Sequence, residues 1–414
     1  MKRKIQQLAN KGFFHIFGSN IINKVVLFCN SIFLVRLLTK EEFGLFSYAE
    51  NLIMLFLLFN GLGTTAATLQ YGSEAQTEEK RNSYFYFGIK TGSFYSIIIC
   101  LLILIISNFV PFKESRTIIR NMCLVPMFLF FFESIQVYFR ISLKNKKFSI
   151  LNSLNTFLLT FFSLLGAYFF NITGIVLFRY LAYIITIITG IYLFSKEFYN
   201  IFNSIKLNNF EIRNFLKFSF IAALNNAISQ LLYLIDIFLI GNIILNKEIV
   251  ASYKTATLIP FALNFIPLSI MMFIYPYFAK NNTNIIWIKH NYLKLTQYLF
   301  IINFFISLFL ILFASQIIQI LFGYDYQDAI IPFKILAFGY FIAATFRIPV
   351  GNILVMLKQI KFGLYLSLIT GIFNIILDIF LIKYYGIVGA AFSTLIVFTF
   401  TSILGTLYLV KILK

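Results

Sequence analysis

Charged residues are scarce in this sequence, and their scarcity excludes a water-soluble protein of this size. Only 12% of the 414 residues are charged, whereas 60% are apolar and the mean hydropathy is +0.87. Soluble globular chains have about a quarter of their residues charged. Apolar stretches long enough to cross roughly 30 Å of hydrocarbon recur along the chain. The sequence therefore predicts an all-α polytopic membrane protein with about twelve transmembrane helices.

Residues that ligate metals or act as nucleophiles are also few. The three cysteines, Cys29, Cys100 and Cys123, lie in apolar runs, and His15 and His290 are isolated. Neither a zinc-binding spacing nor a thiol–histidine pair is present. The phosphate-binding motif G-x-x-x-x-G-K-[ST] is absent, and the outer loops are too short for a catalytic domain. We expect no enzyme, no resident cofactor and no nucleic-acid partner.

Apolar runs bounded by charged or turn residues place the spans along the chain. They are expected near residues 13–37, 43–70, 83–108, 118–139, 148–171, 174–195, 214–244, 249–279, 295–322, 329–356, 360–382 and 386–410. The basic N-terminal segment resembles a secretory signal, but Asn20, Asn23 and Lys24 interrupt its apolar run and no cleavage site follows. We interpret it as a retained first span.

The basic residues predict the orientation of these spans. With a cytoplasmic N-terminus, 22 of the 34 lysines and arginines lie in cytoplasmic segments and 7 lie on the opposite side. Positive residues concentrate on the cytoplasmic side of membrane proteins. Both termini are therefore expected in the cytoplasm, and the net charge of +19 needs no acidic ligand to explain it.

Two pairs of segments indicate an internal duplication. SIFLVRLLTKEEF from Ser31 matches DIFLIGNIILNKEIV from Asp236, each followed by a tyrosine, Tyr48 or Tyr253. GIVLFRYLAYII from Gly174 matches GIVGAAFSTLIV from Gly386. Six spans per repeat give both halves the same orientation. We expect two parallel six-helix bundles, an N-terminal lobe of residues 1–200 and a C-terminal lobe of residues 201–414, with a cleft between them.

Charged residues inside the predicted spans are the strongest functional signal, because a charge in hydrocarbon normally faces a cavity or a partner. They are the bases Lys24, Arg179, Lys254, Lys334 and Arg347 and the acids Glu50, Glu133, Asp236 and Asp378. Polar stripes at helical spacing run along spans 1, 7 and 11. Hydrogen bonding between helices is the alternative role of such stripes.

Four longer segments carry a family resemblance. They are RLLTKEEFGLFSYAENL, YLIDIFLIGNIILNKEIVASYKTATLIP, FGYDYQDAIIPFKILAFGYF and NIILDIFLIKYYGIVGAAFSTLIVF. Together they resemble the polysaccharide-biosynthesis flippases, the O-antigen (Wzx-type) branch of the superfamily that also contains the MATE drug exporters. The resemblance covers nearly the whole chain, although no single motif is diagnostic.

The resemblance implies a MATE-like fold and a flippase in the bacterial inner membrane. Its substrate would be an undecaprenyl-diphosphate-linked oligosaccharide, such as an O-antigen or related surface-polysaccharide repeat unit, moved from the cytoplasmic to the periplasmic leaflet by alternating access. Further partners would be membrane lipids and glycan polymerase machinery.

The charged residues within the spans take roles in such a cavity. The expected substrate-binding residues are Lys24, Lys254, Arg179 and Arg347, whose positive charges suit a diphosphate or an acidic sugar. Glu50, Asp236 and Asp378 are expected either to bind a coupling proton or sodium ion or to balance the cavity bases. Two alternatives remain open, a MATE-type cation-coupled drug antiporter and a peptidoglycan lipid II flippase.

Overall fold

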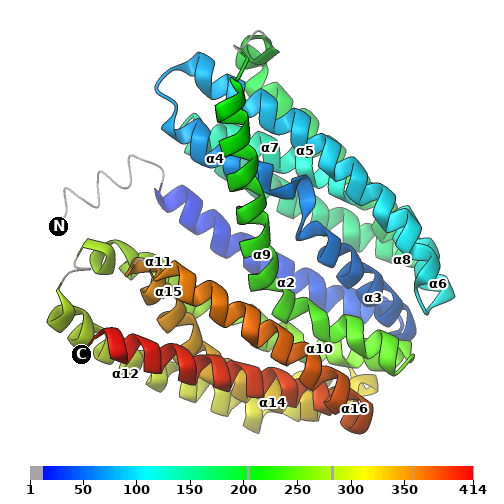
Figure 1. The fold of residues 1–414 in the computed structure, drawn as a ribbon. Helices are drawn as coiled ribbons and strands as arrows, with labels where there is room; N and C mark the ends of the chain where they lie inside the picture. The colour runs from blue at the N-terminus through cyan, green and yellow to red at the C-terminus, as the bar shows by residue number, and fades with distance from the viewer. Residues whose placement is uncertain (1–12, 203–205, 281–283, 358, 414) are drawn as a thin grey trace. The chain divides into compact units, whose positions relative to one another are not determined.

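The structure is a computed structural model that describes residues 13–202, 206–280, 284–357 and 359–413. Helices joined by short connections make up these residues, and no strand occurs among them (Figure 1). Helices satisfy their own backbone hydrogen bonds, which is what a chain crossing hydrocarbon requires. The all-α membrane fold expected from composition is confirmed.

In the first half the helices are α2 (Phe13–Leu37), α3 (Lys40–Leu57), α4 (Thr64–Glu74), α5 (Glu78–Ile106), α6 (Lys113–Asn121), α7 (Val125–Ile141) and α8 (Asn145–Phe202), with short 3₁₀ turns η1 (Asn60–Gly63) and η2 (Ser107–Phe109). Helix α3 begins with a capping box, in which Glu42 N donates to Thr39 Oγ1 at 3.2 Å and Thr39 N donates to Glu42 Oε2 at 3.0 Å. Turn η1 interrupts the span predicted over residues 43–70.

The second half repeats this order. Its elements are α9 (Asn209–Ile243), α10 (Lys247–Ala262), α11 (Phe265–Lys280), α12 (Ile285–Leu312), α13 (Ala314–Leu321), η3 (Tyr324–Ala329), α14 (Ile330–Ile342), the π-helix η4 (Ala343–Arg347), α15 (Ile348–Met356) and α16 (Ile360–Ile412). Asn246 caps α10 by accepting from Glu248 N at 2.9 Å.

Helix α8 is a hairpin of two antiparallel arms. The chain turns at Phe170 and Asn171, where Asn171 has φ 50° and ψ −138°. A Cβ atom on Gly174 would collide with the backbone of Gly166, although residues eight apart in a straight helix never touch. Farther from the turn, Thr186 Oγ1 donates to Asn155 Oδ1 at 3.2 Å.

Helix α16 turns back in the same way. Gly386 has φ 58° and ψ −139°, a conformation that costs glycine little and other residues more. A Cβ atom on Gly389 would collide with the carbonyl of Leu381, and the rings of Phe362 and Tyr408 stack with centroids 3.7 Å apart. Both arms of each hairpin are long and apolar.

Eight helices of the described chain are long and apolar enough to cross a membrane, and bent α9 is a ninth candidate. Each hairpin counts once in these totals. If the two arms of each hairpin are counted separately and α2 is added, the total equals the twelve predicted spans. The number twelve remains a prediction.

The two hairpins correct the register of the internal repeat. The sequence match aligned Gly174 with Gly386, whereas the structure gives Asn171 and Gly386 the same backbone conformation. Gly174 and Gly389 then lie at equivalent positions, three residues beyond each turn. Gly174 closely approaches the backbone of Gly166, and Gly389 closely approaches that of Leu381. The sequence alignment of these two segments was therefore out of register by three residues. A shared turn geometry aligns the halves more reliably than apolar letters do.

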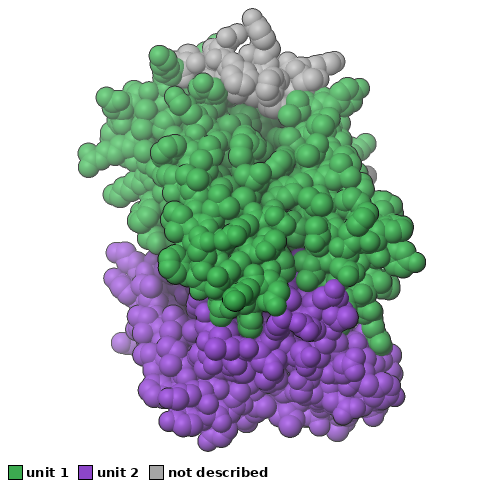
Figure 2. All heavy atoms as spheres, turned by 90° about the vertical axis from the view of Figure 1, so that its right-hand side faces the viewer, with its two compact units in different colours: residues 1–38, 49–227 green, residues 39–48, 228–414 purple. Residues whose placement is uncertain are grey.

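The described chain forms two compact units, shown in different colours in Figure 2. Unit 1 contains residues 1–38 and 49–227, and unit 2 contains residues 39–48 and 228–414. Helices α3 and α9 each contribute to both units. The lobe boundary expected at residue 200 remains a prediction.

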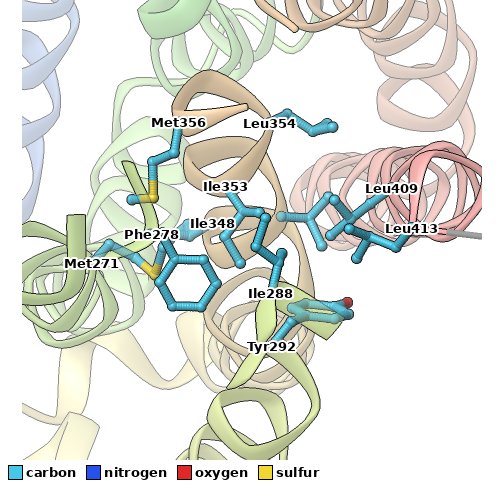
Figure 3. Close-up of a cluster of buried hydrophobic side chains, with 11 residues drawn as sticks. Met271, Phe278, Ile288, Tyr292, Ile348, Ile353, Leu354, Met356, Leu409 and Leu413 are labelled. Atoms are coloured by element: carbon cyan, nitrogen blue, oxygen red, sulfur yellow. The ribbon is translucent and has the colours of Figure 1, made fainter. Parts of the chain in front are cut away.

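A hydrophobic cluster joins four helices of unit 2. It contains Met271, Phe278, Ile288, Tyr292, Ile348, Val350, Ile353, Leu354, Met356 and Leu409 from α11, α12, α15 and α16, together with Leu413 directly after α16, and ten of these residues are labelled in Figure 3. Ile353 and Ile288 are fully buried there. This packing anchors α15 directly after the π-helix.

The close approach in the α16 hairpin gives the first testable prediction. Gly389→Ala should lower the melting temperature in detergent, because the new methyl group must push the Leu381 backbone away, at a cost of about 1–3 kcal/mol. Gly371→Ala in the same helix meets open space and should leave the melting temperature unchanged or raise it. Equal melting temperatures for the two variants would contradict the hairpin.

Candidate functional site

Two buried carboxyl groups, the acid pair, lie together in unit 2. Asp236 of α9 and Asp378 of α16 are 2% and 0% exposed, and hydrogen bonds link them to adjacent residues of α16, Asp236 to Thr394 directly and Asp378 to Ser393 through Asn374. Tyr253 OH donates to Asp236 Oδ2 at 2.5 Å, and Thr394 Oγ1 donates to the same oxygen at 2.7 Å. Three helices, α9, α10 and α16, thus build this site.

The side chain of Asp378 is hydrogen-bonded by a residue of its own hairpin, α16. Asn374 Nδ2 donates to Asp378 Oδ2 at 3.0 Å and to Ser393 Oγ at 3.1 Å. The other oxygen of each acid, Oδ1, accepts no hydrogen bond from a donor among the described residues. Two adjacent carboxylates in a buried site repel one another unless a positive charge lies between them. The oxygens suit a hard monovalent cation or a shared proton.

Arg347 ends the π-helix of unit 2 and lies against two aromatic rings. Its Nη1 donates to Tyr233 OH at 2.7 Å, and its guanidinium carbon lies 5.6 Å from the Tyr233 ring centroid and 4.9 Å from that of Phe398. Within the described chain no carboxylate pairs with this guanidinium. The rings hold the cation by cation–π attraction without neutralising it.

Arg179 is placed differently, in unit 1. Its Nη2 lies 2.7 Å from Glu50 Oε1, and the two side chains are only 18% and 23% exposed. Buried Tyr183, one turn along α8, lies close to this ion pair and to Glu133. The arginine and the acid therefore neutralise one another, which leaves less charge for an anionic ligand.

The two candidate lysines make no ion pair in the described part of the chain. Lys24 of α2 in unit 1 is exposed, and Lys254 of α10 in unit 2 is half-buried. Asn23, next to Lys24, is buried and its Nδ2 has no acceptor among the described residues. The side chains of Asn20 in predicted span 1 and Ser229 in predicted span 7 lie outside the described residues.

The structure thus joins the sequence-predicted site residues in pairs, Arg179 with Glu50 and Asp236 with Asp378. The sequence did not reveal Thr394 and Ser393, which help to hold the acid pair, or Phe398, which lies against Arg347, and Tyr253 served only to align the repeat. A hydroxyl in an apolar helix is a weak signal, because such residues usually bond their own backbone. The bond from Thr394 to Asp236 joins α16 to α9 and is visible only in the folded structure.

The ion pair of unit 1 gives a second prediction. Glu50→Gln and Arg179→Gln should each destabilise the protein by roughly 2 kcal/mol, because each leaves a charge in an apolar span without its partner. The double variant should be less destabilised than the sum of the single variants, since neither charge remains. Melting temperatures of all four proteins in one detergent test this, and additive effects would show that the pair contributes no coupling energy.

Comparison with known proteins places this geometry in a family. A family profile described as polysaccharide biosynthesis protein matches residues 33–332. A search of curated proteins finds no match.

Solved structures share the fold at low sequence identity. An inward-facing multidrug resistance MATE family transporter of the MOP superfamily is 14% identical, with 94% of each chain covered and a TM-score of 0.78. The lipid II flippase MurJ in an inward closed conformation is 16% identical, with 95% of this chain and 86% of that chain covered and a TM-score of 0.75.

A third relative is a MOP superfamily transporter from Pyrococcus furiosus, 16% identical, with 97% of this chain and 94% of that chain covered and a TM-score of 0.66. These neighbours are named as transporters or flippases, in keeping with the expectation that the chain is not an enzyme. The family match covers most of the chain and the apolar helices recur throughout it. The chain is a multi-pass membrane protein that belongs to the polysaccharide biosynthesis protein family and has the MATE-like fold.

Proposed function

We propose that this protein is a flippase that moves an undecaprenyl-diphosphate-linked oligosaccharide from the cytoplasmic to the periplasmic leaflet of the bacterial inner membrane by alternating access. The observation that carries the proposal is the family match over residues 33–332 in a chain with the fold of a lipid II flippase. An O-antigen or related surface-polysaccharide repeat unit is the proposed cargo. Both termini would lie in the cytoplasm, and glycan polymerase machinery would receive the product.

A charged headgroup requires a polar path, whereas the lipid tail can remain in hydrocarbon. Lys24, Lys254 and Arg347 supply positive charge within spans, and no carboxylate of the described chain neutralises them. They are our proposed contacts for the diphosphate or an acidic sugar. Arg179 belongs to the same proposed set, but its pairing with Glu50 makes it the weakest member.

The membrane potential favours this direction of transport. Moving about two negative charges outward from a negative cytoplasm releases roughly 4–5 kcal/mol at 100 mV. An ion gradient would be a second energy source. Binding of a cation or a proton at Asp236 and Asp378 would couple that gradient to transport. Glu50 would then balance Arg179 and take no part in coupling.

Two related functions use the same fold. A MATE-type cation-coupled drug antiporter is favoured by the acid pair, and a peptidoglycan lipid II flippase is favoured by the likeness to MurJ. The unpaired bases distinguish them, since a cationic drug would be repelled by Lys254 and Arg347 whereas a lipid-linked anion would be attracted.

Replacement of the two lysines tests the proposed function. Lys24→Ala and Lys254→Ala should each lower surface glycan at least tenfold in a flippase-null strain at normal expression, because each removes a charge-assisted contact to the headgroup. Lys113→Ala, an exposed lysine at the start of α6, serves as the control and should complement fully. Full complementation by both cavity variants would remove these lysines from the mechanism.

Binding of radioactive sodium to the purified protein tests the coupling role. Wild type should bind ²²Na⁺, while Asp236→Asn and Asp378→Asn should lose it, because an amide cannot supply the negative charge that the cation requires. Glu50→Gln should keep sodium binding. A failure of wild type to bind sodium, with transport still dependent on both aspartates, would assign the site to a proton instead.

A further inference from the structure

A cleft in unit 2 contains none of the residues proposed to bind the cargo or an ion. It has a volume of about 640 Å³ and lies between the end of α9, the start of α10, the start of α14 and the turn of the α16 hairpin. Isoleucine side chains form most of its wall, among them Ile243, Ile249, Ile331, Ile382 and Ile387. Ligand sites usually have a volume of about 300–1,000 Å³ and a largely apolar lining. The cleft therefore has the size and the lining of a ligand site.

The cleft lies at a membrane surface. Each arm of the α16 hairpin is longer than the ~20 residues that cross roughly 30 Å of hydrocarbon, so the turn at Gly386 lies near the boundary with water. Tyr384 and Tyr385 precede this turn and are 72% and 66% exposed. Tyrosine side chains concentrate where the headgroups of a bilayer meet its hydrocarbon. A ligand in the cleft is therefore placed at the level where apolar chains end and headgroups begin.

The charged groups that line the cleft leave it with a positive charge. Asp328 lines the cleft, but Lys40 Nζ lies 2.9 Å from its Oδ1 and Ser252 Oγ donates to its Oδ2 at 2.7 Å. The ion pair with Lys40 neutralises this acid. Lys383 also lines the cleft, is exposed, and forms no ion pair with an acid of the described chain. A ligand with an anionic group complements this charge.

Lys334 of α14 adds a second positive charge next to the cleft. It is an exposed lysine within a predicted span, three residues after Ile331, and residues at this spacing share a helix face. Helical side chains lean toward the N-terminus of their helix, so Lys334 extends toward Ile331 and the cleft. A lysine within a span requires an anion or water, and its long apolar stem can carry the ammonium to the membrane surface. No acid of the described chain pairs with it.

We propose that this cleft binds a phospholipid of the surrounding bilayer, with an acyl chain along the isoleucines and the phosphate between Lys334 and Lys383. A phospholipid joins an apolar chain to an anionic phosphate, and the cleft joins an apolar wall to two lysines that no acid of the described chain neutralises. Basic pockets between membrane helices bind lipid headgroups in this way. Phosphatidylglycerol should bind more tightly than phosphatidylcholine, because the lysines repel the positive group of choline. The bound lipid is distinct from the transported cargo.

Native mass spectrometry of the delipidated full-length protein in detergent tests the site, with phosphatidylglycerol and phosphatidylcholine of identical acyl chains as probes. Wild type should bind one phosphatidylglycerol roughly fivefold more tightly than phosphatidylcholine. Lys334→Gln and Lys383→Gln should each weaken phosphatidylglycerol binding about fivefold, because each removes a charge-assisted contact to the phosphate. Lys289→Gln removes the same charge from an exposed position of α12 and should bind as wild type does.

Filling the cleft tests the position of the acyl chain without changing a charge. Ile331→Trp should weaken binding of both lipids roughly tenfold, because this side chain lines the cleft and the larger indole ring would take the space of the acyl chain. Ile369→Trp places the same ring on α16 outside the cleft and should leave both affinities unchanged. The two isoleucines are 59% and 56% exposed, so neither substitution should lower the melting temperature.

Three results would overturn the phospholipid site. The first is a wild type that retains no phosphatidylglycerol, or retains it no better than both lysine variants do. The second is binding of both lipids by Ile331→Trp within twofold of wild type. The third is displacement of phosphatidylglycerol from wild type by an equal concentration of farnesyl diphosphate, which would assign the cleft to the cargo. These variants change neither the acid pair nor a proposed cargo contact, so lipid binding is measured independently of glycan export.

Discussion

A polar group within hydrocarbon must find a partner, and the rest of this structure depends on that constraint. The backbone meets it by forming helices throughout the described spans. Charged side chains meet it in three ways, by an ion pair at Arg179 and Glu50, by hydroxyl and amide donors around the acid pair, and by aromatic rings at Arg347. Only the first of these leaves no net charge, and so the other two are the functional candidates.

The aligned hairpins show how the two halves of the chain have diverged. With Asn171 equivalent to Gly386, Arg179 occupies the place of Thr394, and buried Ser163 occupies that of Asp378. The earlier sequence match likewise paired Ser31 with Asp236. The first half thus has serines where the second half has its two acids. The two hairpins share the backbone geometry of their turns, whereas the charges at equivalent positions differ.

Much of the fold and part of the candidate site could be predicted before the structure. Charges inside apolar runs identified Asp236, Asp378 and Arg347, because the cost of burying a charge does not depend on the arrangement of the helices. Their partners could not be predicted. Tyr253 reaches Asp236 across 17 residues and Thr394 reaches it across 158, and no local pattern encodes such distances.

The sequence by itself determined that this is an all-helical, multi-pass membrane protein with charges at a few points within its spans, because hydropathy and charge act over single segments. The tertiary structure decided which charges are neutralised, since that depends on where α8 and α16 fold back. It also corrected the register of the repeat, because apolar helices have similar amino-acid sequences but make different contacts. Those contacts distinguish Arg179, which is paired with Glu50, from Arg347, which lies against two aromatic rings and pairs with no carboxylate of the described chain.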